Sequence, residues 1–333
     1  MAHAMKSPVR QKILDAFRKA GGGYLSGEKI AGEIGISRTA VWKHIAELRK
    51  EGFLVEAVPK KGYRLRETPG EWSEEEIYWG LETKRIGRPI RFFETVDSTQ
   101  KIAHELAANG AEEGTIVLAD EQTMGRGRLS RGWHSKKGKG IWMSLIIRPD
   151  IAVQKAPQFT LLAAVGVAGA IEDVAGLSPK IKWPNDLLIE GKKVCGILTE
   201  MVSQENRVLA IIIGIGINVN HRPGDFPDAL KDKATSLAIH AGKEIPRAKL
   251  VQSFCLKFER LYDTYLKAGF LPVKTLWETY ACSIGQRIEA RMVQGTIRGK
   301  ALGIDEEGVL LLQDDSGRIH HIYSADIEIE KDV

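Results

Sequence analysis

The sequence has little cysteine and no long apolar segment. Three cysteines in 333 residues are too few for a disulfide framework and indicate a reducing compartment. The longest apolar run, residues 161–171, is shorter than the roughly 18–20 residues that a membrane-spanning helix needs. The N-terminal residues also lack the apolar core of a secretory signal peptide. We therefore expect a soluble cytoplasmic protein that has no membrane partner.

Acidic residues are scarce at the start of the chain. Residues 1–66 contain 14 lysines and arginines but only 6 aspartates and glutamates, whereas the rest of the chain contains 34 basic and 37 acidic side chains. A basic domain joined to a mildly acidic body predicts a polyanionic partner for that domain alone. The length and the hydrophobic fraction of 43% predict two or three domains with real cores.

The basic segment, residues 5–66, has the pattern of a winged helix-turn-helix domain. Ser7-Pro8 marks the start of a first helix, because proline is favoured at the first helical position. After a second helix and a short turn, Ser37 is expected to cap a third helix. The residues that follow, 53–65, predict a β-hairpin that forms the wing.

The third helix and the wing carry side chains suited to DNA. Short polar and basic residues at the start of a recognition helix reach base edges and phosphates in the major groove, and wing lysines reach an adjacent phosphate. The candidate DNA-binding residues are Ser37, Arg38, Thr39, Trp42, Lys43, Lys60 and Lys61. The alternative is a winged helix that docks proteins, in which the basic residues form only a solvated face.

The rest of the chain divides into a linker and two domains. Residues 67–73 contain proline and glycine and predict the linker. Residues 74–283 alternate short β runs with helical patterns, which favours an α+β domain with mixed strands. Strands are expected at 90–96, 115–119, 141–148, 194–202 and 208–219, and helices at 98–108, 157–174, 247–268 and 271–281. Alternating strands in residues 284–333 predict a small closed β-barrel.

Glycines alternate with arginines from Gly125 to Arg128, and no acidic residue occurs between residues 122 and 149. Glycines let the backbone approach a ligand closely, and guanidinium groups present rigid positive forks to phosphate or carboxylate. The segment lacks the Gly-Lys-Ser/Thr of a P-loop and the third glycine of a dinucleotide fingerprint. The alternative is a disordered basic loop that touches nucleic acid nonspecifically.

Three further motifs are candidates for ligand contacts. Lys182 closes a short strand and precedes the stiff pair Trp183-Pro184, which would hold its ammonium rigidly. A lysine at a strand end is more often solvated, so this pattern favours a functional role only modestly. Residues 214–218, Gly-Ile-Gly-Ile-Asn, predict a central strand whose glycines leave space for a planar group to pack against the backbone. Residues 97–99, Asp-Ser-Thr, stand at a strand-to-helix junction that offers hydroxyls and free helix N–H groups, or else only a helix cap.

Taken in this order behind a winged helix, the motifs resemble those of the bifunctional biotin protein ligases that also repress the biotin operon. The motifs are Asp97-Ser98-Thr99, Glu121-Gln122, Gly125-Arg126-Gly127-Arg128, Trp133, Lys182-Trp183-Pro184-Asn185-Asp186, Gly196-Ile197-Leu198 and residues 214–218. Leu129-Ser130 departs from the family pattern, in which another basic residue and a glycine often stand. The resemblance covers the chain from Met5 onward and implies a central domain of the class II synthetase and biotin ligase type, followed by an SH3-like barrel.

The resemblance implies a two-step reaction. Biotin and ATP, with Mg²⁺, form biotinyl-5′-adenylate and pyrophosphate, and the adenylate then acylates one lysine of a biotin carboxyl carrier protein. The residues implied in biotin binding are Ser98, Thr99, Gln100, Gln122, Arg126, Gly127, Arg128, Trp133 and Lys182. The residues implied in catalysis, as positive charges beside the reacting anions, are Lys182, Arg126 and Arg128. Asn218 and Gly125 are implied on the nucleotide side, and the Mg²⁺ ligands stay undefined.

The adenylate is also implied as a corepressor, which promotes a homodimer that binds operator DNA at two half-sites. Two other functions stay open. A repressor that senses a small molecule without turnover would not need both a basic ligand loop and a fixed Lys182. A lipoate-type ligase shares the architecture, but the winged helix and the glycine-arginine segment favour biotin.

Overall fold

The computed structural model describes residues 8–67, 72–205 and 207–330. It divides into two compact units, one that ends at Leu81 and one that begins at Glu82. Ser7, expected at the start of the first helix, and residues 68–71 of the expected linker lie outside the described residues.

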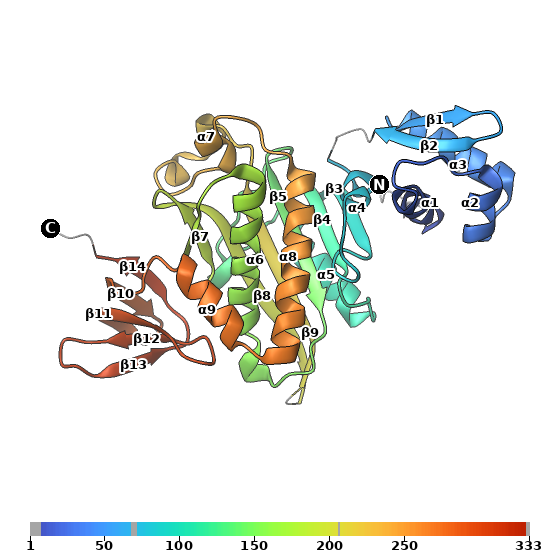
Figure 1. Ribbon diagram of the computed structural model, residues 1–333. Coiled ribbons are helices and arrows are strands. Elements are labelled where there is room, and N and C mark those ends of the chain that lie inside the picture. The colour runs from blue at the N-terminus through green and yellow to red at the C-terminus, as the bar shows by residue number, and fades with distance from the viewer. Residues whose placement is uncertain (1–7, 68–71, 206, 331–333) are drawn as a thin grey trace. The chain divides into compact units, whose positions relative to one another are not determined.

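The first unit contains the expected winged helix-turn-helix (Figure 1). Its elements are α1 (Pro8–Lys19), α2 (Gly27–Ile34), α3 (Arg38–Lys50), β1 (Leu54–Val58) and β2 (Gly62–Glu67). Ser37 caps α3, because its side chain accepts a hydrogen bond from the backbone N–H of Ala40. Gly35 ends α2 in the left-handed conformation, with φ of 77°. Ile13, Ile30, Val41 and Leu48 are fully buried in a core that all three helices share.

A further helix, α4 (Glu74–Trp79), belongs to this first unit rather than to the second. It packs on α1, and its residue Ile77 is fully buried, as is Leu81 just beyond its end. The hydroxyl of Tyr78 donates a hydrogen bond of 2.7 Å to the carboxylate of Asp15 on α1. The compact unit therefore extends past residue 74, where the sequence predicted the start of the central α+β domain.

The second unit is built on a seven-stranded mixed sheet with the order β3-β4-β5-β9-β8-β7-β6. Strands β3 and β4 are parallel, and the other neighbours are antiparallel. The strands are β3 (Ile90–Val96), β4 (Ile116–Gln122), β5 (Gly140–Ile147), β6 (Lys180–Lys182), β7 (Asp186–Ile189), β8 (Lys192–Gln204) and β9 (Arg207–Asn218). The apolar residues of β5 and the isoleucine-rich run of β9 explain the buried centre, since both of its faces are covered.

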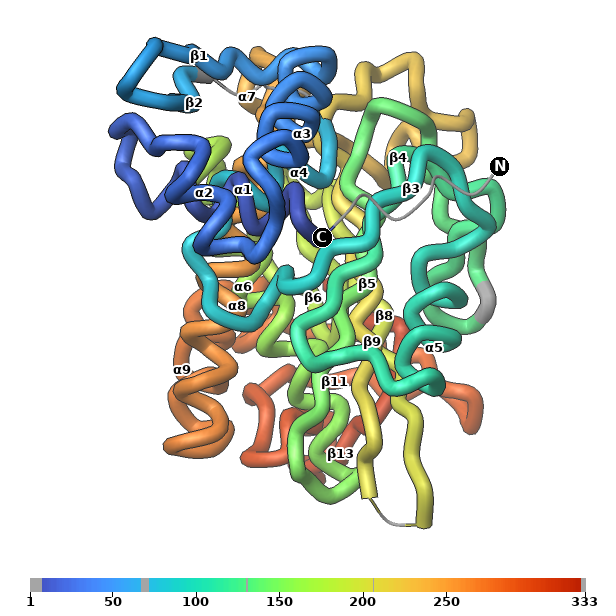
Figure 2. Tube along the Cα trace, turned by 90° about the vertical axis from the view of Figure 1, so that its right-hand side faces the viewer, coloured from blue at the N-terminus to red at the C-terminus, as the bar shows by residue number. Residues whose placement is uncertain are grey.

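Helices cover both faces of this sheet. Figure 2 shows α5 on one side of the strands and α6, α8 and α9 on the other. The helices are α5 (Thr99–Ala108), α6 (Gln158–Ala175), α7 (Leu237–Ala241), α8 (Arg247–Ala268) and α9 (Leu271–Tyr280). By length and composition the segment Val153–Ala175 is apolar enough to cross a membrane, but most of it is buried inside this unit. It is therefore accounted for as a core helix.

The last part of the chain forms a small five-stranded antiparallel sheet with the order β13-β12-β11-β10-β14. Its strands are β10 (Arg287–Met292), β11 (Gly295–Ile304), β12 (Leu310–Gln313), β13 (Ile319–Ile322) and β14 (Asp326–Ile329). The α+β fold class, with an N-terminal helix-turn-helix and a C-terminal β domain, is confirmed. Strand β14 was missed, because four residues with alternating acids are too short a pattern to separate from a turn.

Candidate ligand pocket

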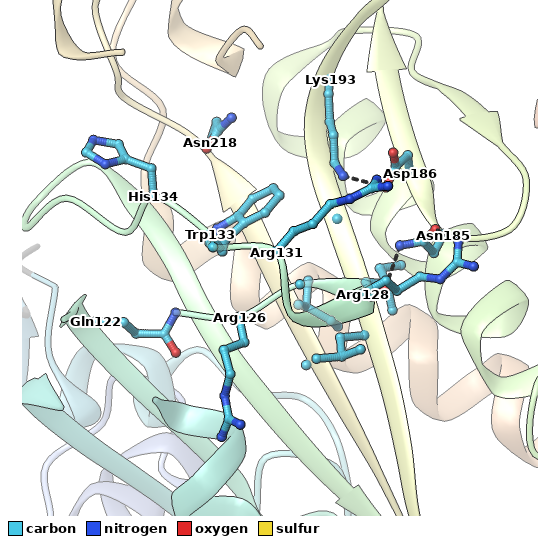
Figure 3. A pocket seen from close by; sticks show the side chains of 18 of the residues that line it. Gln122, Arg126, Arg128, Arg131, Trp133, His134, Asn185, Asp186, Lys193 and Asn218 are labelled. Atoms are coloured by element: carbon cyan, nitrogen blue, oxygen red, sulfur yellow. Dashed lines mark hydrogen bonds and ion pairs between the residues drawn. The ribbon is translucent and has the colours of Figure 1, made fainter. Parts of the chain in front are cut away.

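A cavity of about 490 Å³ opens in the second unit over strands β5, β8 and β9, beneath the glycine-arginine segment (Figure 3). Of the predicted ligand residues, Ser98, Thr99, Gln100, Gln122, Arg126, Gly127, Arg128, Trp133 and Asn218 line it. Residues distant in the sequence join them, including His134, Asn185, Asp186, Lys193 and Asp326. Lys182 and Gly125 are not among the lining residues.

The floor of the pocket is a buried polar network at the start of α5. The backbone N–H of Thr99 donates 2.9 Å to the side-chain oxygen of Gln122. The hydroxyl of Ser144 on β5 donates 2.9 Å to the side-chain oxygen of Gln100. A Cβ added at Gly214 would lie 2.5 Å from that same oxygen, so this glycine makes room for Gln100. These polar atoms are held in place before any ligand arrives.

The flat group for which the strand glycines make room is Trp133. A Cβ added at Gly216 on β9 would lie 2.5 Å from the indole, and one at Gly196 on β8 would lie 2.8 Å from it. The indole N–H is buried without a hydrogen-bond partner among the described residues. The ammonium of Lys193 lies 5.2 Å from the ring centre, within the range of a cation–π contact.

Gly125 acts on the loop rather than on the cavity. Its carbonyl oxygen accepts a 2.8 Å hydrogen bond from the backbone N–H of Trp133, and a Cβ at this position would lie 2.6 Å from the Trp133 carbonyl oxygen. The backbone N–H of Gly127 donates 2.7 Å to Arg131. Between them Leu129 has a φ of 53°, a conformation that costs a non-glycine residue about 1 kcal/mol or more. The segment is thus a folded hairpin-like loop.

Positive side chains surround the mouth of the pocket, and most have partners. Arg128 donates to Asn185 at 3.0 Å and to Ser324 at 2.9 Å, and Arg131 forms an ion pair with Asp326. Arg126 has no hydrogen-bond or ion-pair partner for its guanidinium among the described side chains. In Figure 3 it points away from Arg131 and Lys193.

Lys193 and Lys233 line the pocket, whereas Lys182, the lysine that the sequence indicated, does not. Lys182 ends β6 and lies opposite Asp186 in the register of β6 and β7, outside the lining residues. Lys193 on β8 lines the cavity and forms a 2.6 Å ion pair with Asp186. Sequence reasoning passed over Lys193 because it stands in a Lys-Lys pair after a turn. The available signal was the nearby Gly196 on the same strand.

One end of the pocket is formed by residues after β9, for which no motif was predicted. Phe226, Leu230, Lys233 and Ala234 line this end, next to the predicted Asn218 at the end of β9. The carboxylate of Asp225, next to Phe226, accepts hydrogen bonds from the backbone N–H of Arg222 and from Lys136. These bonds hold the pKa of Asp225 well below its usual range.

The cysteines take no part in this site. Cys195 and Cys255 are completely buried, and burial raises the pKa of both thiols well above the usual range. A thiolate nucleophile is therefore excluded at these two positions, and chemistry in the pocket depends on binding and charge.

The candidate DNA-binding residues lie together on the surface of the first unit. Arg38, Thr39 and Lys43 are exposed on α3, and 61% of the Trp42 side chain is accessible. Ser37 is exposed while it caps the helix, and Lys60 and Lys61 occupy the turn between β1 and β2. The expected helix and wing are therefore both available to a partner.

Comparison with known proteins gives three family matches along the chain. Residues 9–64 match an HTH domain, residues 92–218 match the biotin/lipoate A/B protein ligase family, and residues 283–329 match the biotin protein ligase C terminal domain. The chain is 58% identical to the bifunctional ligase/repressor BirA of Bacillus subtilis over 325 residues, 98% of this chain and all of that protein. It is 28% identical to the protein of the same name from Escherichia coli, over 89% of this chain and 90% of that one.

Among solved structures, the biotin protein ligase of Aquifex aeolicus in complex with biotin and ATP is similar. The TM-score is 0.63 at 30% sequence identity, and the match covers 74% of this chain and all of that one.

Proposed function

Because the chain belongs to the family of bifunctional ligase/repressors, within the biotin/lipoate A/B protein ligases, we propose that its pocket joins biotin to AMP and passes the biotinyl group to a carrier protein. The observation that carries this proposal is a buried polar floor beneath a ring of cations, a shape suited to a neutral polar ring joined to an anionic tail. The enzyme is an ATP-dependent biotin–protein ligase, and it works in the cytoplasm.

The polar floor supports the assignment of biotin. The ureido ring of biotin offers N–H donors and a carbonyl acceptor in one plane, and Ser98, Thr99, Gln100 and Gln122 supply matching hydroxyl and amide groups. Trp133 supplies an apolar wall for the rest of the ligand. Buried polar groups that would be left unpaired by a wrong ligand give strong discrimination, so this end of the pocket selects the ring.

Adenylation brings two anions together, because the carboxylate of biotin attacks the α-phosphate of ATP and pyrophosphate leaves. Positioning and neutralisation of charge therefore supply most of the catalysis, and no side-chain nucleophile is needed. Arg126, Arg128 and Lys193 are positively charged and line the pocket, which supports a role for them in neutralising the reacting anions. Lys182 stays a prediction as a catalytic residue, since it lies near this site but not on the cavity wall.

Mg²⁺ enters this scheme with ATP. No group of three or more His, Cys, Asp or Glu side chains that could hold a metal occurs in the described parts of the chain. This fits a cation that is held by substrate phosphates with one or two carboxylates, and Asp186 and Asp326 line the pocket. When bound, Mg²⁺ neutralises phosphate charge.

In the second step, the amine of a carrier lysine attacks the carbonyl carbon of the adenylate, loses a proton and displaces AMP. The acceptor is a lysine of a biotin carboxyl carrier protein. The winged helix-turn-helix binds operator DNA of biotin biosynthesis genes, with the adenylate as corepressor. A single winged helix makes few base contacts, which favours an adenylate-bound homodimer on two half-sites.

Exchange of labelled pyrophosphate into ATP tests the first step, because exchange requires a reversible adenylation. We expect exchange with biotin and ATP together and none when biotin is omitted. A protein that binds biotin but shows no exchange would be a ligand-sensing repressor without turnover. Exchange that depends on lipoate and not on biotin would instead indicate a lipoate-type ligase.

A further inference from the structure

His221 is a buried histidine whose ring nitrogens make no hydrogen bond to the described residues. Its exposure is 1%. Burial lowers the pKa of the imidazole to about 4, so the ring is neutral near pH 7. An unpaired buried polar group is destabilising. The property of His221 that its surroundings do use is the flat face of the ring.

That flat face lies on Phe226. The two rings are stacked with centroids 4.9 Å apart and planes 17° from parallel. Trp142 meets the imidazole edge-on at 6.0 Å, and the ring centre of His134 lies 6.5 Å away. Phe226 and His134 line the pocket, whereas His221 and Trp142 do not. Phe226 is therefore supported from behind by His221 while it forms part of the cavity wall.

The backbone around these two rings is fixed by other bonds. The hydroxyl of Ser236 donates 2.7 Å to the carbonyl oxygen of His221. Asp225 accepts 2.8 Å from the backbone N–H of Arg222 and 2.6 Å from Lys136. With the main chain held on both sides, the stack on His221 is the aromatic contact that can fix the tilt of the Phe226 ring.

We propose that His221 is a positioning residue for the nucleotide end of the pocket and acts through Phe226. This inference rests on the proposed adenylation, in which Asn218 and its neighbours face the nucleotide. A purine base is planar and needs a wall of fixed tilt, because aromatic contacts depend on ring geometry. His221 and Phe226 lie after β9, whereas Gln122 of the polar floor lies on β4 and Thr99 and Gln100 lie on α5, so we expect the contacts to biotin to depend little on this stack.

The test measures the KM for ATP and the KM for biotin separately in pyrophosphate exchange. We expect His221→Ala to raise the KM for ATP about fivefold to tenfold, the order of one aromatic contact, and to change the KM for biotin less than twofold. His221→Phe keeps the flat face and is expected to restore the KM for ATP. His221→Leu fills most of the volume without a flat face, and it replaces the alanine variant if the latter does not fold.

A double-mutant cycle with Phe226→Ala shows whether His221 acts through Phe226. We expect the double variant to be no worse than Phe226→Ala alone. The inference is overturned if the effects add, if the leucine variant raises both KM values equally, or if His221→Phe fails to restore the KM for ATP. A wild-type protein without exchange would overturn the proposed function itself, whereas normal exchange with any of these three results overturns only the role of His221.

Discussion

The indole of Trp133 lies against the bare backbone of Gly216, where a single added methyl carbon would come within 2.5 Å of the ring. The glycine sits on a central strand and the tryptophan on the loop above the pocket. The position of the loop is thus set by the absence of a side chain on the strand.

Gly216→Ala is expected to displace the indole and lower biotin-dependent pyrophosphate exchange about tenfold or more, since small misplacements in a site are costly. The strand can accept alanine, so the thermal midpoint should change little. Gly32→Ala on α2 is a matched control, because a Cβ there meets nothing within 4 Å. Exchange at the wild-type rate in the Gly216 variant would show that the loop adjusts freely.

Lys193→Ala is expected to lower kcat for adenylation by about 10²–10³, the typical loss of one charge that stabilises a transition state. The variant also leaves Asp186 without its ion-pair partner, so Asp186→Asn combined with Lys193→Ala serves as the charge-balanced control. Lys182→Ala is measured beside it. A larger loss in the Lys182 variant than in the Lys193 variant would assign the catalytic cation to β6 instead.

A fragment that begins at Glu82 is expected to be more soluble than one that begins at Glu74. The longer fragment carries α4 without α1, and so exposes Ile77 and Leu81, which are fully buried in the whole protein. Both fragments should lose operator binding. The test compares the solubility, thermal unfolding and pyrophosphate exchange of the two fragments. If the two fragments do not differ, α4 does not need α1 to cover its apolar residues.

Stability is expected to fall with acidification in a way that depends on His221. The pKa of the buried imidazole is about 4, below the ordinary value near 6.5, so the unfolded chain takes up a proton that the folded protein resists. The stability loss grows as the pH falls from 6.5 to 4, and amounts to about 1–3 kcal/mol. Asp225 favours the charged form of this ring, and Lys136, Lys139 and His134 oppose it.

The measurement compares the thermal midpoints of wild type and His221→Phe across this range of pH. Near neutral pH the two midpoints should differ by a constant amount. Below pH 6 the midpoint of the wild type should fall more steeply than that of the variant. Parallel curves would mean that other groups carry the whole acid dependence.

Lys60→Ala and Lys61→Ala are each expected to weaken DNA binding by a similar factor for operator and for unrelated DNA. Loss of one phosphate contact should reduce the slope of log K against log salt by about 1. Lys267→Ala, an exposed lysine in the second unit, is the control and should leave the slope unchanged. An unchanged slope in the wing variants would indicate that the hairpin does not reach the phosphates.

The sequence predicted those features of the fold that depend on residues close together in the chain. The helix cap at Ser37 and the strand at 90–96 follow from nearby residues alone, and the structure agrees with both. Lys193 was harder to find, because its contact with Trp133 joins a strand to a loop sixty residues earlier in the chain, and locally only the nearby Gly196 pointed to it. Helix α4 has a local start signal that was overlooked, since Ser73 caps it and three glutamates follow, but its assignment to the first unit depends on contacts with α1, which lies far earlier in the chain.

The bonds from Arg128 to Ser324 and from Arg131 to Asp326 have a consequence for the order in which the protein is made. Synthesis delivers the winged helix first, and the two residues that fasten the loop over the pocket emerge from the ribosome among the last described here. A chain that stops early therefore carries a finished DNA-binding surface and an unfinished pocket. Such a fragment lacks these C-terminal partners of Arg128 and Arg131. We therefore expect it to hold the adenylate weakly and, because the proposed operator complex is an adenylate-bound dimer, to bind operator DNA weakly as well.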